Sequence, residues 1–138
     1  YDALPEAMKR RLEGLSARYV YDVRATLRDQ TNESDDTLSS AVHPLVRVHP
    51  DTGRKALYLS RLMTRNIVGM DRAESDALLA ELFDHTERPD FVYAHVWAVS
   101  DLLIWDNRCL NHARNDFPAS QQRHLRRVTV SEPDAQPT

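Results

Sequence analysis

One histidine and two arginines stand at fixed spacings near the carboxy-terminal end of the sequence. His112 follows an apolar run that ends at Trp105, and Arg123 and Arg127 come eleven and fifteen residues after the histidine. A neutral imidazole binds transition metals such as iron. The planar guanidinium of arginine binds carboxylates through two parallel hydrogen bonds. The spacing therefore predicts a metal site beside which an organic anion is held.

The two arginines flank the start of a predicted strand. Residues 124–130 are predicted to be extended, since Leu125, Val128 and Val130 are apolar. On a strand, the side chains at 123, 125 and 127 share one face. At about 3.3 Å per residue, the backbones of Arg123 and Arg127 would lie about 13 Å apart. This distance favours two anions around one metal over a single shared anion.

The strands that would position these residues are predicted from apolar runs. Residues 91–97 and 102–105 are rich in β-branched and aromatic side chains and read as two short strands joined by a tight turn. Upstream, residues 42–48 and 55–59 flank the turn sequence His49-Pro50-Asp51-Thr52-Gly53. These two segments predict a β-hairpin.

Two helices are predicted from apolar spacing. Leu4, Met8, Leu12 and Leu15 recur at helical intervals, and this helix should end near Gly14. The second begins at Asp71, a residue suited to the N-cap position, and runs to His85 or Thr86. Its predicted buried stripe consists of Ala77, Leu78, Leu82 and Phe83.

Two polar segments are predicted to lack regular structure. Residues 29–40 are acidic and poor in large apolar side chains, which is typical of a solvated connection; a mobile lid over a site is the alternative. Residues 131–138 have the composition of a flexible tail. Helices early, strands late and short turns between them predict a β-rich α+β sandwich or barrel decorated with helices.

Composition narrows the class of protein. The 138 residues suit one domain, and a net charge of −3 gives no general attraction to nucleic acid or to anionic membranes. A nucleic-acid module built on Arg123, Arg126 and Arg127 is therefore disfavoured. The single cysteine, Cys109, excludes an internal disulfide, and no apolar run is long enough for a membrane span or a signal peptide. We expect a cytoplasmic protein, and because the chain begins with Tyr1 it is treated as a possible fragment.

The sequence resembles the carboxy-terminal half of the taurine and 2,4-dichlorophenoxyacetate dioxygenase (TauD/TfdA-like) family. The likeness is carried by HVW at residues 95–97, SDLLIWDNRC at 100–109, His112, Arg123 and Arg127. It extends upstream through HPLVRVHP at 43–50 and TGRKAL at 52–57, and loosely to YDALP at 1–5. The resemblance implies part of a double-stranded β-helix (jelly-roll) core with flanking helices. Residues 1–130 would then be the carboxy-terminal portion of a single dioxygenase domain.

The resemblance also implies a reaction and roles for individual residues. Such enzymes use Fe(II) and 2-oxoglutarate to hydroxylate a small carboxylate- or sulfonate-bearing substrate, and they release succinate and CO2. His112 would be the distal iron ligand, Arg123 would bind 2-oxoglutarate, and Arg127 would contact the acidic group of the substrate. Met63 falls in a segment that lines the substrate pocket in relatives, with plain packing equally open. The family often forms dimers or tetramers, so a homo-oligomer is expected.

One part of the family pattern is missing. The first histidine and the carboxylate form a His-x-Asp or His-x-Glu motif, which belongs upstream of the segment that resembles this chain. His49-Pro50-Asp51 has those letters but matches a turn in the family, so these residues are not expected to bind iron. The chain then carries one iron ligand of three. Either another segment completes the site, or the chain is a catalytically incomplete anion-binding β-domain.

The cysteine, the tryptophans and the polar turn residues that precede His112 are expected to have structural roles. Cys109 is expected to pack at a strand end, and Trp97 and Trp105 are expected in the core. Asp106 and Asn107 are expected to shape the turn before His112 and to help orient it.

Overall fold

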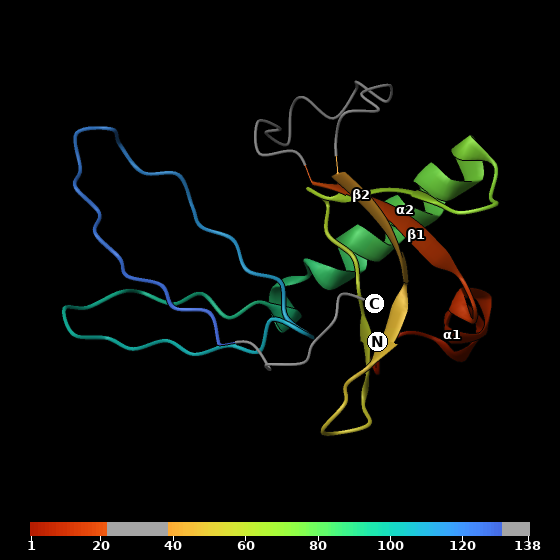
Figure 1. The fold of residues 1–138 in the computed structure, drawn as a ribbon, viewed down its shortest axis with the longest axis horizontal. Coiled ribbons are helices and arrows are strands. Elements are labelled where there is room, and N and C mark those ends of the chain that lie inside the picture. The colour runs from red at the N-terminus through yellow and green to blue at the C-terminus, as the bar shows by residue number, and fades with distance from the viewer. Residues whose placement is uncertain (22–38, 131–138) are drawn as a thin grey trace.

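The computed structural model describes residues 1–21 and 39–130. Helices, strands and a single 3-10 turn occupy this part of the chain as far as Phe91, and residues 92–130 project from it as long loops (Figure 1). In chain order the elements are α1 (Glu6–Leu12), β1 (Ser16–Tyr21), β2 (Ser39–Pro44), β3 (Val46–Val48), β4 (Lys55–Leu57), β5 (Thr64–Ile67), α2 (Arg72–Thr86) and the 3-10 turn Pro89–Phe91.

Helix α1 confirms the first helix prediction. Pro5 precedes its first turn, where the absence of a backbone N–H costs nothing. Leu4 and Leu12 are buried. Gly14 has a φ of 73°, a left-handed conformation that suits glycine, and it turns the chain from the helix into β1.

A three-stranded antiparallel sheet has the order β2-β1-β5. In the central strand, Ala17 and Tyr19 are buried while Arg18 is exposed, the two-residue alternation of a sheet with one covered face. Ala17 pairs with His43 on β2 and with Ile67 on β5. The sequence did not predict β1 or β5, because the two strands pair across some fifty residues of chain, as Ala17 and Ile67 do, and no local pattern encodes such pairing.

The predicted hairpin is confirmed for residues 46–48 and 55–57, whereas residues 42–44 of its predicted first strand belong to β2 and pair with β1. Strands β3 and β4 pair antiparallel, with Val46 opposite Leu57. Between them the backbone N–H of His49 donates to the carbonyl of Arg54 at 2.8 Å, and the N–H of Gly53 donates to the carbonyl of His49 at 2.9 Å. The turn at His49 is therefore rigidly held at one end of the hairpin.

Helix α2 also confirms its predicted limits. The Asp71 side chain caps it by accepting from the backbone N–H groups of Ala73 at 2.9 Å and Glu74 at 3.4 Å. The buried residues are Ser75, Leu78, Leu79, Leu82 and Phe83. Ala77 was wrongly placed in the buried stripe, because a stripe running at i, i+3, i+4, i+7 and i+8 from Ser75 leaves position 77 exposed.

The core lies between the sheets and α2. Its buried hydrophobic residues run from Leu4 to Phe83. The Ser75 hydroxyl links α2 to β5, since it accepts from the backbone N–H of Ile67 at 2.8 Å. Among the described residues, none beyond Phe83 has a buried side chain.

The strands predicted at 91–97, 102–105 and 124–130 do not form. Apart from the 3-10 turn that ends at Phe91, these residues have no helix or strand. Their apolar side chains are open to solvent: Val96 is 88% exposed, Leu102 83% and Val128 86%. A strand needs a neighbouring backbone to satisfy its N–H and C=O groups and a surface to cover its apolar face. The described part of the chain supplies neither to these runs.

Several smaller predictions are wrong, or fall on residues outside the described part of the chain. Trp97 is 41% exposed and Trp105 is half-buried, and neither belongs to the core. Cys109 is exposed, and no strand of the described residues ends near it, so it does not pack at a strand end. Residues 39 and 40 of the predicted polar loop belong to β2, while 29–38 and the predicted tail at 131–138 lie outside the described residues. No helix within residues 1–21 and 39–130 is long and apolar enough to cross a membrane.

Candidate metal and anion site

His112 is held near the packed part of the chain by the residue before it. The Asn111 side-chain amide donates to the backbone carbonyl of Leu59 at 2.8 Å, close to the end of β4. The His112 ring is exposed and lies 5.0 Å from the Trp105 ring, centroid to centroid, at an angle of 46°. Its imidazole is therefore accessible to a ligand.

The described residues do not complete a three-ligand site around His112. Within residues 1–21 and 39–130, the side chains that gather closely enough to hold a metal are those of His49, Asp106 and Cys109, whose ligand atoms lie within 4.8 Å of one another. His112 is not among them. One imidazole does not fit a resident iron ion, which needs further ligands from the protein.

The other three predicted site residues, Arg123, Arg127 and Met63, do not share one environment. Both arginines are exposed. No hydrogen bond or ion pair joins either of them to another described residue. Because residues 124–130 are not a strand, the predicted shared face of Arg123 and Arg127 is not formed. Met63 is half-buried against the core, and its backbone carbonyl accepts from the N–H of Val20 at 2.9 Å.

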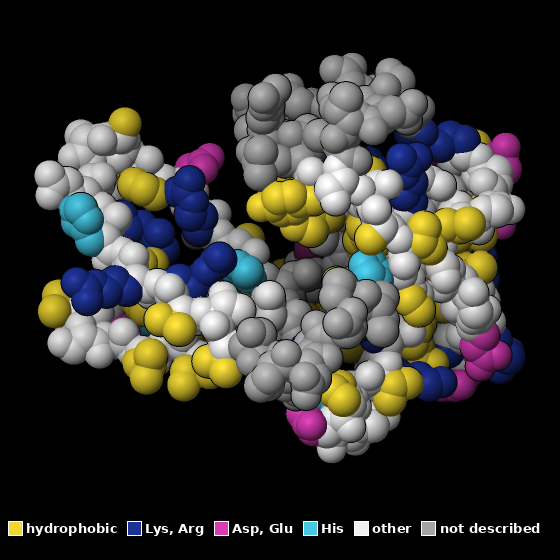
Figure 2. Space-filling view, viewed as in Figure 1, with side chains coloured by type: hydrophobic (Ala, Val, Ile, Leu, Met, Phe, Trp, Pro, Cys, Tyr) yellow, Lys and Arg dark blue, Asp and Glu magenta, His cyan; other side chains and the backbone are white. Residues whose placement is uncertain are grey.

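Arg side chains are spread along the projecting loops, with apolar side chains exposed beside them (Figure 2). Among the apolar residues open to solvent there are Val99, Leu102, Ile104 and Val130.

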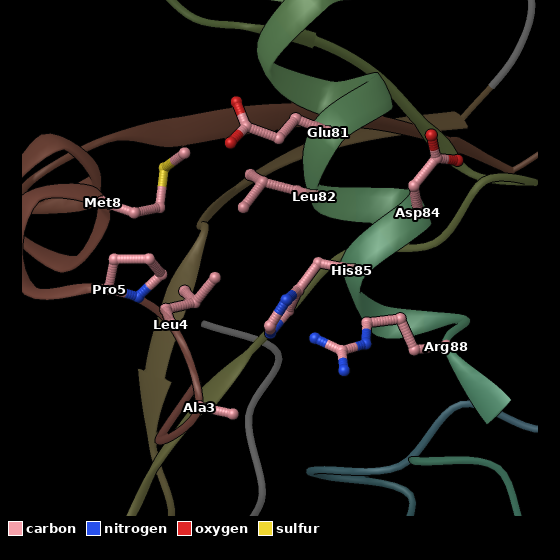
Figure 3. Close-up of a pocket in the computed structure, with 9 residues that line it drawn as sticks. All are labelled: Ala3, Leu4, Pro5, Met8, Glu81, Leu82, Asp84, His85 and Arg88. Atoms are coloured by element: carbon pink, nitrogen blue, oxygen red, sulfur yellow. The ribbon is translucent and has the colours of Figure 1, made fainter. Parts of the chain in front are cut away.

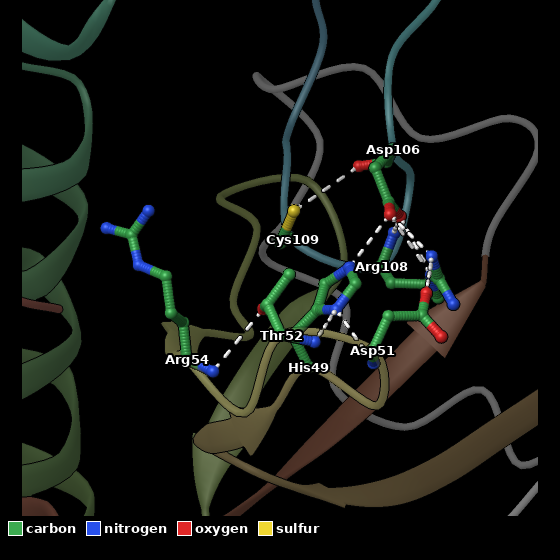
Figure 4. Close-up of polar contacts among 7 residues, drawn as sticks. All are labelled: His49, Asp51, Thr52, Arg54, Asp106, Arg108 and Cys109. Carbon is green, nitrogen blue, oxygen red and sulfur yellow. Dashed lines mark hydrogen bonds and ion pairs between the residues drawn. The ribbon is translucent and has the colours of Figure 1, made fainter.

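A polar cluster joins the β3–β4 turn to the loop before His112 (Figure 4). The Nε2 atom of His49 lies 2.8 Å from Oδ2 of Asp106. The Nδ1 atom of the same ring accepts from the backbone N–H groups of Asp51 and Thr52, both at 3.3 Å. A neutral imidazole carries one N–H. Since Nδ1 accepts, the proton is on Nε2, and His49 donates to Asp106.

Arg108 joins two carboxylates in this cluster. Its Nη2 atom donates to Oδ2 of Asp106 at 2.7 Å and to Oδ2 of Asp51 at 2.8 Å, while Nε donates to Oδ1 of Asp106 at 3.0 Å. The hydrogen bond from Arg108 and then that from His49 hold the pKa of the Asp106 carboxyl well below its usual range. The same pairing raises the pKa of the Arg108 guanidinium. Asp106 is therefore ionised, and both of its carboxylate oxygens accept hydrogen bonds.

The atoms of His49 and Asp106 that could bind a metal already take part in hydrogen bonds. A metal at Nε2 of His49 would have to displace the proton that this atom donates, and a metal at Asp106 would compete with the Arg108 guanidinium. Cys109 lies at the edge, with Sγ 3.8 Å from the backbone carbonyl of Asp106. The arrangement is that of a hydrogen-bonded ion pair. Sequence reasoning assigned His49 and Asp106 to separate turns, and their separation of 57 residues hid the contact.

A hollow of about 520 Å³ lies elsewhere, between α1 and the end of α2 (Figure 3). Leu4 and Met8 line one side, and Leu82, His85 and Arg88 line the other. Burial, followed by the nearby positive charge of the amino terminus, lowers the pKa of His85. None of the predicted site residues lines this hollow.

Antiparallel sheets flanked by helices, with a histidine followed by two arginines, are features of the jelly-roll class of 2-oxoglutarate-dependent dioxygenases. The chain belongs to the taurine catabolism dioxygenase TauD, TfdA family, whose pattern matches residues 1–129. The resemblance seen in the sequence and the predicted fold class are thereby confirmed.

Named relatives support this membership. The chain is 42% identical over 133 residues to an alpha-ketoglutarate-dependent 2,4-dichlorophenoxyacetate dioxygenase of Burkholderia sp. (strain RASC), which covers 94% of this chain and 44% of the relative. It is 39% identical to an (S)-phenoxypropionate/alpha-ketoglutarate-dioxygenase of Sphingobium herbicidovorans, over 89% of this chain and 46% of the relative. The chain thus spans less than half the length of these relatives.

Solved structures agree with this assignment. AAD-2, crystallised with Mn(II) and N-oxalylglycine, superposes with a TM-score of 0.62 at 33% identity, over 71% of this chain and 39% of that one. A taurine dioxygenase from Burkholderia xenovorans superposes with a TM-score of 0.54 at 33% identity, over 66% of this chain and 28% of that one.

Proposed function

We propose that this chain forms the carboxy-terminal portion, residues 1–130, of a single Fe(II)- and 2-oxoglutarate-dependent dioxygenase domain. The reaction is the hydroxylation of a small substrate bearing a carboxylate or sulfonate, with release of succinate and CO2. The observation that carries the proposal is the 42% identity to a named alpha-ketoglutarate-dependent dioxygenase over 94% of the chain. Bound iron would supply the oxidation chemistry, and the residues of this chain bind and orient.

Four residues are assigned roles in this proposal. His112 contributes one iron ligand, and its exposed imidazole is compatible with that role. Arg123 binds the far carboxylate of 2-oxoglutarate, and Arg127 binds the acidic group of the substrate; both guanidinium groups are exposed and can reach an anion. Met63 borders the substrate. The presence of Mn(II) and N-oxalylglycine, a dicarboxylic acid, in AAD-2 supports a metal and a dicarboxylate as ligands.

The remaining iron ligands come from another polypeptide segment in this proposal. The apolar residues left open in the loops, such as Val96 and Val128, support the association, because a partner that pairs with these runs would cover them. The chain covers 44% of the first relative, so more than half of that protein's length has no counterpart here. A homo-oligomer of the completed domain belongs to the same proposal.

Calorimetry on the 138-residue chain tests the anion site. We expect 2-oxoglutarate to bind, and Arg123→Ala to weaken binding at least about tenfold through loss of a charge-assisted hydrogen-bonded pair. Arg126→Ala is the matched control, since it removes an exposed arginine three residues away and should leave the affinity unchanged. Equal losses in the two variants would contradict the assignment.

Succinate release tests the reaction. The complete enzyme should form succinate from 2-oxoglutarate only with Fe(II), and His112→Ala or Arg123→Ala should abolish this. Undiminished succinate release in either variant would remove the corresponding residue from the site.

A second candidate is a metal-free anion-binding β-domain. It is favoured by one observation: the described residues bring no other side chains of a metal site to His112. Calorimetry with and without Mn(II) separates the two candidates. Binding of 2-oxoglutarate that Mn(II) leaves unchanged, even in the complete protein, supports this second candidate.

A further inference from the structure

We propose that His49, Asp51, Asp106 and Arg108 form a clasp that positions residues 109–112, and hence His112, against the packed part of the chain. The four residues of the clasp are positioning residues, because they act on His112 through the backbone of the turn before it. The inference rests on the proposed function in one respect, the role of His112 as an iron ligand.

The clasp joins two parts of the fold that otherwise diverge. Residues 92–130 project as loops and bury none of their described side chains. Three polar contacts nevertheless tie this region to the hairpin and to the residues after it: His49 to Asp106, Asp51 to Arg108, and Leu59 to Asn111. All three lie within six residues of His112, so the loop is attached where the predicted metal ligand stands.

The backbone between the clasp and His112 is defined at both ends. The Asp106 carboxylate accepts from the backbone N–H of Arg108 at 2.8 Å, and its carbonyl accepts from the N–H of Leu110 at 3.1 Å. At the other end the Asn111 amide is bonded to the carbonyl of Leu59. A turn closed at its start and anchored at its end leaves the His112 ring a restricted range of directions, beside Trp105.

The clasp is built as a fixed contact. The His49 side chain is 9% exposed, and both of its ring nitrogens are engaged. Asp106 accepts from a neutral imidazole and from a guanidinium at once, and Arg108 holds two carboxylates. Two carboxylates, one guanidinium and one uncharged imidazole leave a net charge of −1. Such a set stabilises the loop position without requiring a metal ion.

The same segment contains a matched control. His95 and Asp101 form an imidazole–carboxylate pair at 3.1 Å, and Asp101 also accepts from the backbone N–H of Ala98 at 2.8 Å. This pair has the chemistry of His49 and Asp106, but its partners are only six residues apart and both belong to the projecting loops. Asp101→Ala should therefore disturb Ala98 and leave residues 108–112 unchanged.

Amide hydrogen exchange on the 138-residue chain tests the clasp. We expect Asp106→Ala to speed exchange at the amides of residues 108–110 about tenfold or more, since the side-chain acceptor of the Arg108 amide is lost and the turn is no longer tied to the hairpin. Asp106→Asn should restore much of the protection, because an amide oxygen still accepts. Exchange in the core turns of α2 should not change. Wild-type exchange at 108–110 in Asp106→Ala, or equal acceleration throughout α2, would overturn the inference.

The affinity of the complete enzyme for Mn(II), followed by electron paramagnetic resonance, links the clasp to His112. Loss of a residue that orients a metal ligand typically weakens metal binding about 10- to 100-fold, and we expect such a loss in Asp106→Ala and none in Asp101→Ala. If His112→Ala lowers the affinity but Asp106→Ala does not, the inference fails alone. If His112→Ala itself leaves the affinity unchanged, the proposed metal role of His112 fails with it.

Discussion

Asp106 accepts a hydrogen bond from Nε2 of His49 at 2.8 Å, although the two residues are 57 positions apart in the chain. One comes from the turn between β3 and β4, and the other from the loop that leads to His112. The contact ties a projecting loop to the packed part of the chain. It makes Asp106 a structural anchor with direct consequences for the direction of the His112 ring.

The lowered pKa of Asp106 predicts how the stability of the turn at residues 108–110 depends on pH. A carboxyl whose folded pKa is lowered contributes stability that is present above its unfolded pKa, about 3.9. That contribution is lost only as the pH falls through the lower folded pKa. We therefore expect protection of the 108–110 amides to persist at pH 4 and to fall in stronger acid. Titration of the Asp106 carboxyl carbon by NMR at or above the ordinary value would contradict this.

Arg127 should determine affinity for the acidic substrate. In the complete enzyme, Arg127→Ala should raise the KM for a carboxylate- or sulfonate-bearing substrate about tenfold or more, as expected for loss of a hydrogen bond between two charged groups. The affinity for 2-oxoglutarate should change little. Arg126→Ala provides the comparison at the neighbouring position. A rise in KM that is the same in both variants would indicate a general loss of positive charge.

Tyr19 should make the fold sensitive to alkali. Its hydroxyl donates to the backbone carbonyl of Tyr58, and burial raises the pKa of the phenol above its usual value. A raised folded pKa contributes stability that is fully present below the unfolded pKa, about 10, and is lost as the pH rises through the folded value.

Denaturant unfolding between pH 8 and pH 11 checks this. Tyr19→Phe should cost about 1 kcal/mol at pH 8, from loss of the hydrogen bond, and should flatten the alkaline decline. Tyr21→Phe is the control, since Tyr21 is 60% exposed. An alkaline decline as steep in Tyr19→Phe as in the wild type would assign the effect to other groups.

The division between core and loops predicts unequal costs for two leucines. Leu82 is fully buried in α2, so Leu82→Ala should lower the free energy of unfolding by about 2–5 kcal/mol. Leu102 is 83% exposed in the loops, and Leu102→Ala should change that free energy by less than about 0.5 kcal/mol. Chemical denaturation of the 138-residue chain measures both. A large loss on Leu102→Ala would mean that the loop packs in solution.

Local signals in the sequence were sufficient for part of the fold. The N-cap at Asp71, the spacing of Leu4, Met8 and Leu12, and the turn that ends at Gly53 predicted both helices and the hairpin. In each case the residues that determine the structure are neighbours along the chain. Strands β1 and β5 were missed, because their pairing depends on residues far away in sequence.

The sequence by itself determined family membership, through motifs whose letters and spacing need no coordinates. Only the tertiary structure decided that residues 92–130 stay unpaired and that His49 meets Asp106. Apolar composition indicates that a segment can form a strand, but a strand forms only against a partner backbone. A contact across 57 residues depends in the same way on how both segments pack, and no local pattern encodes it.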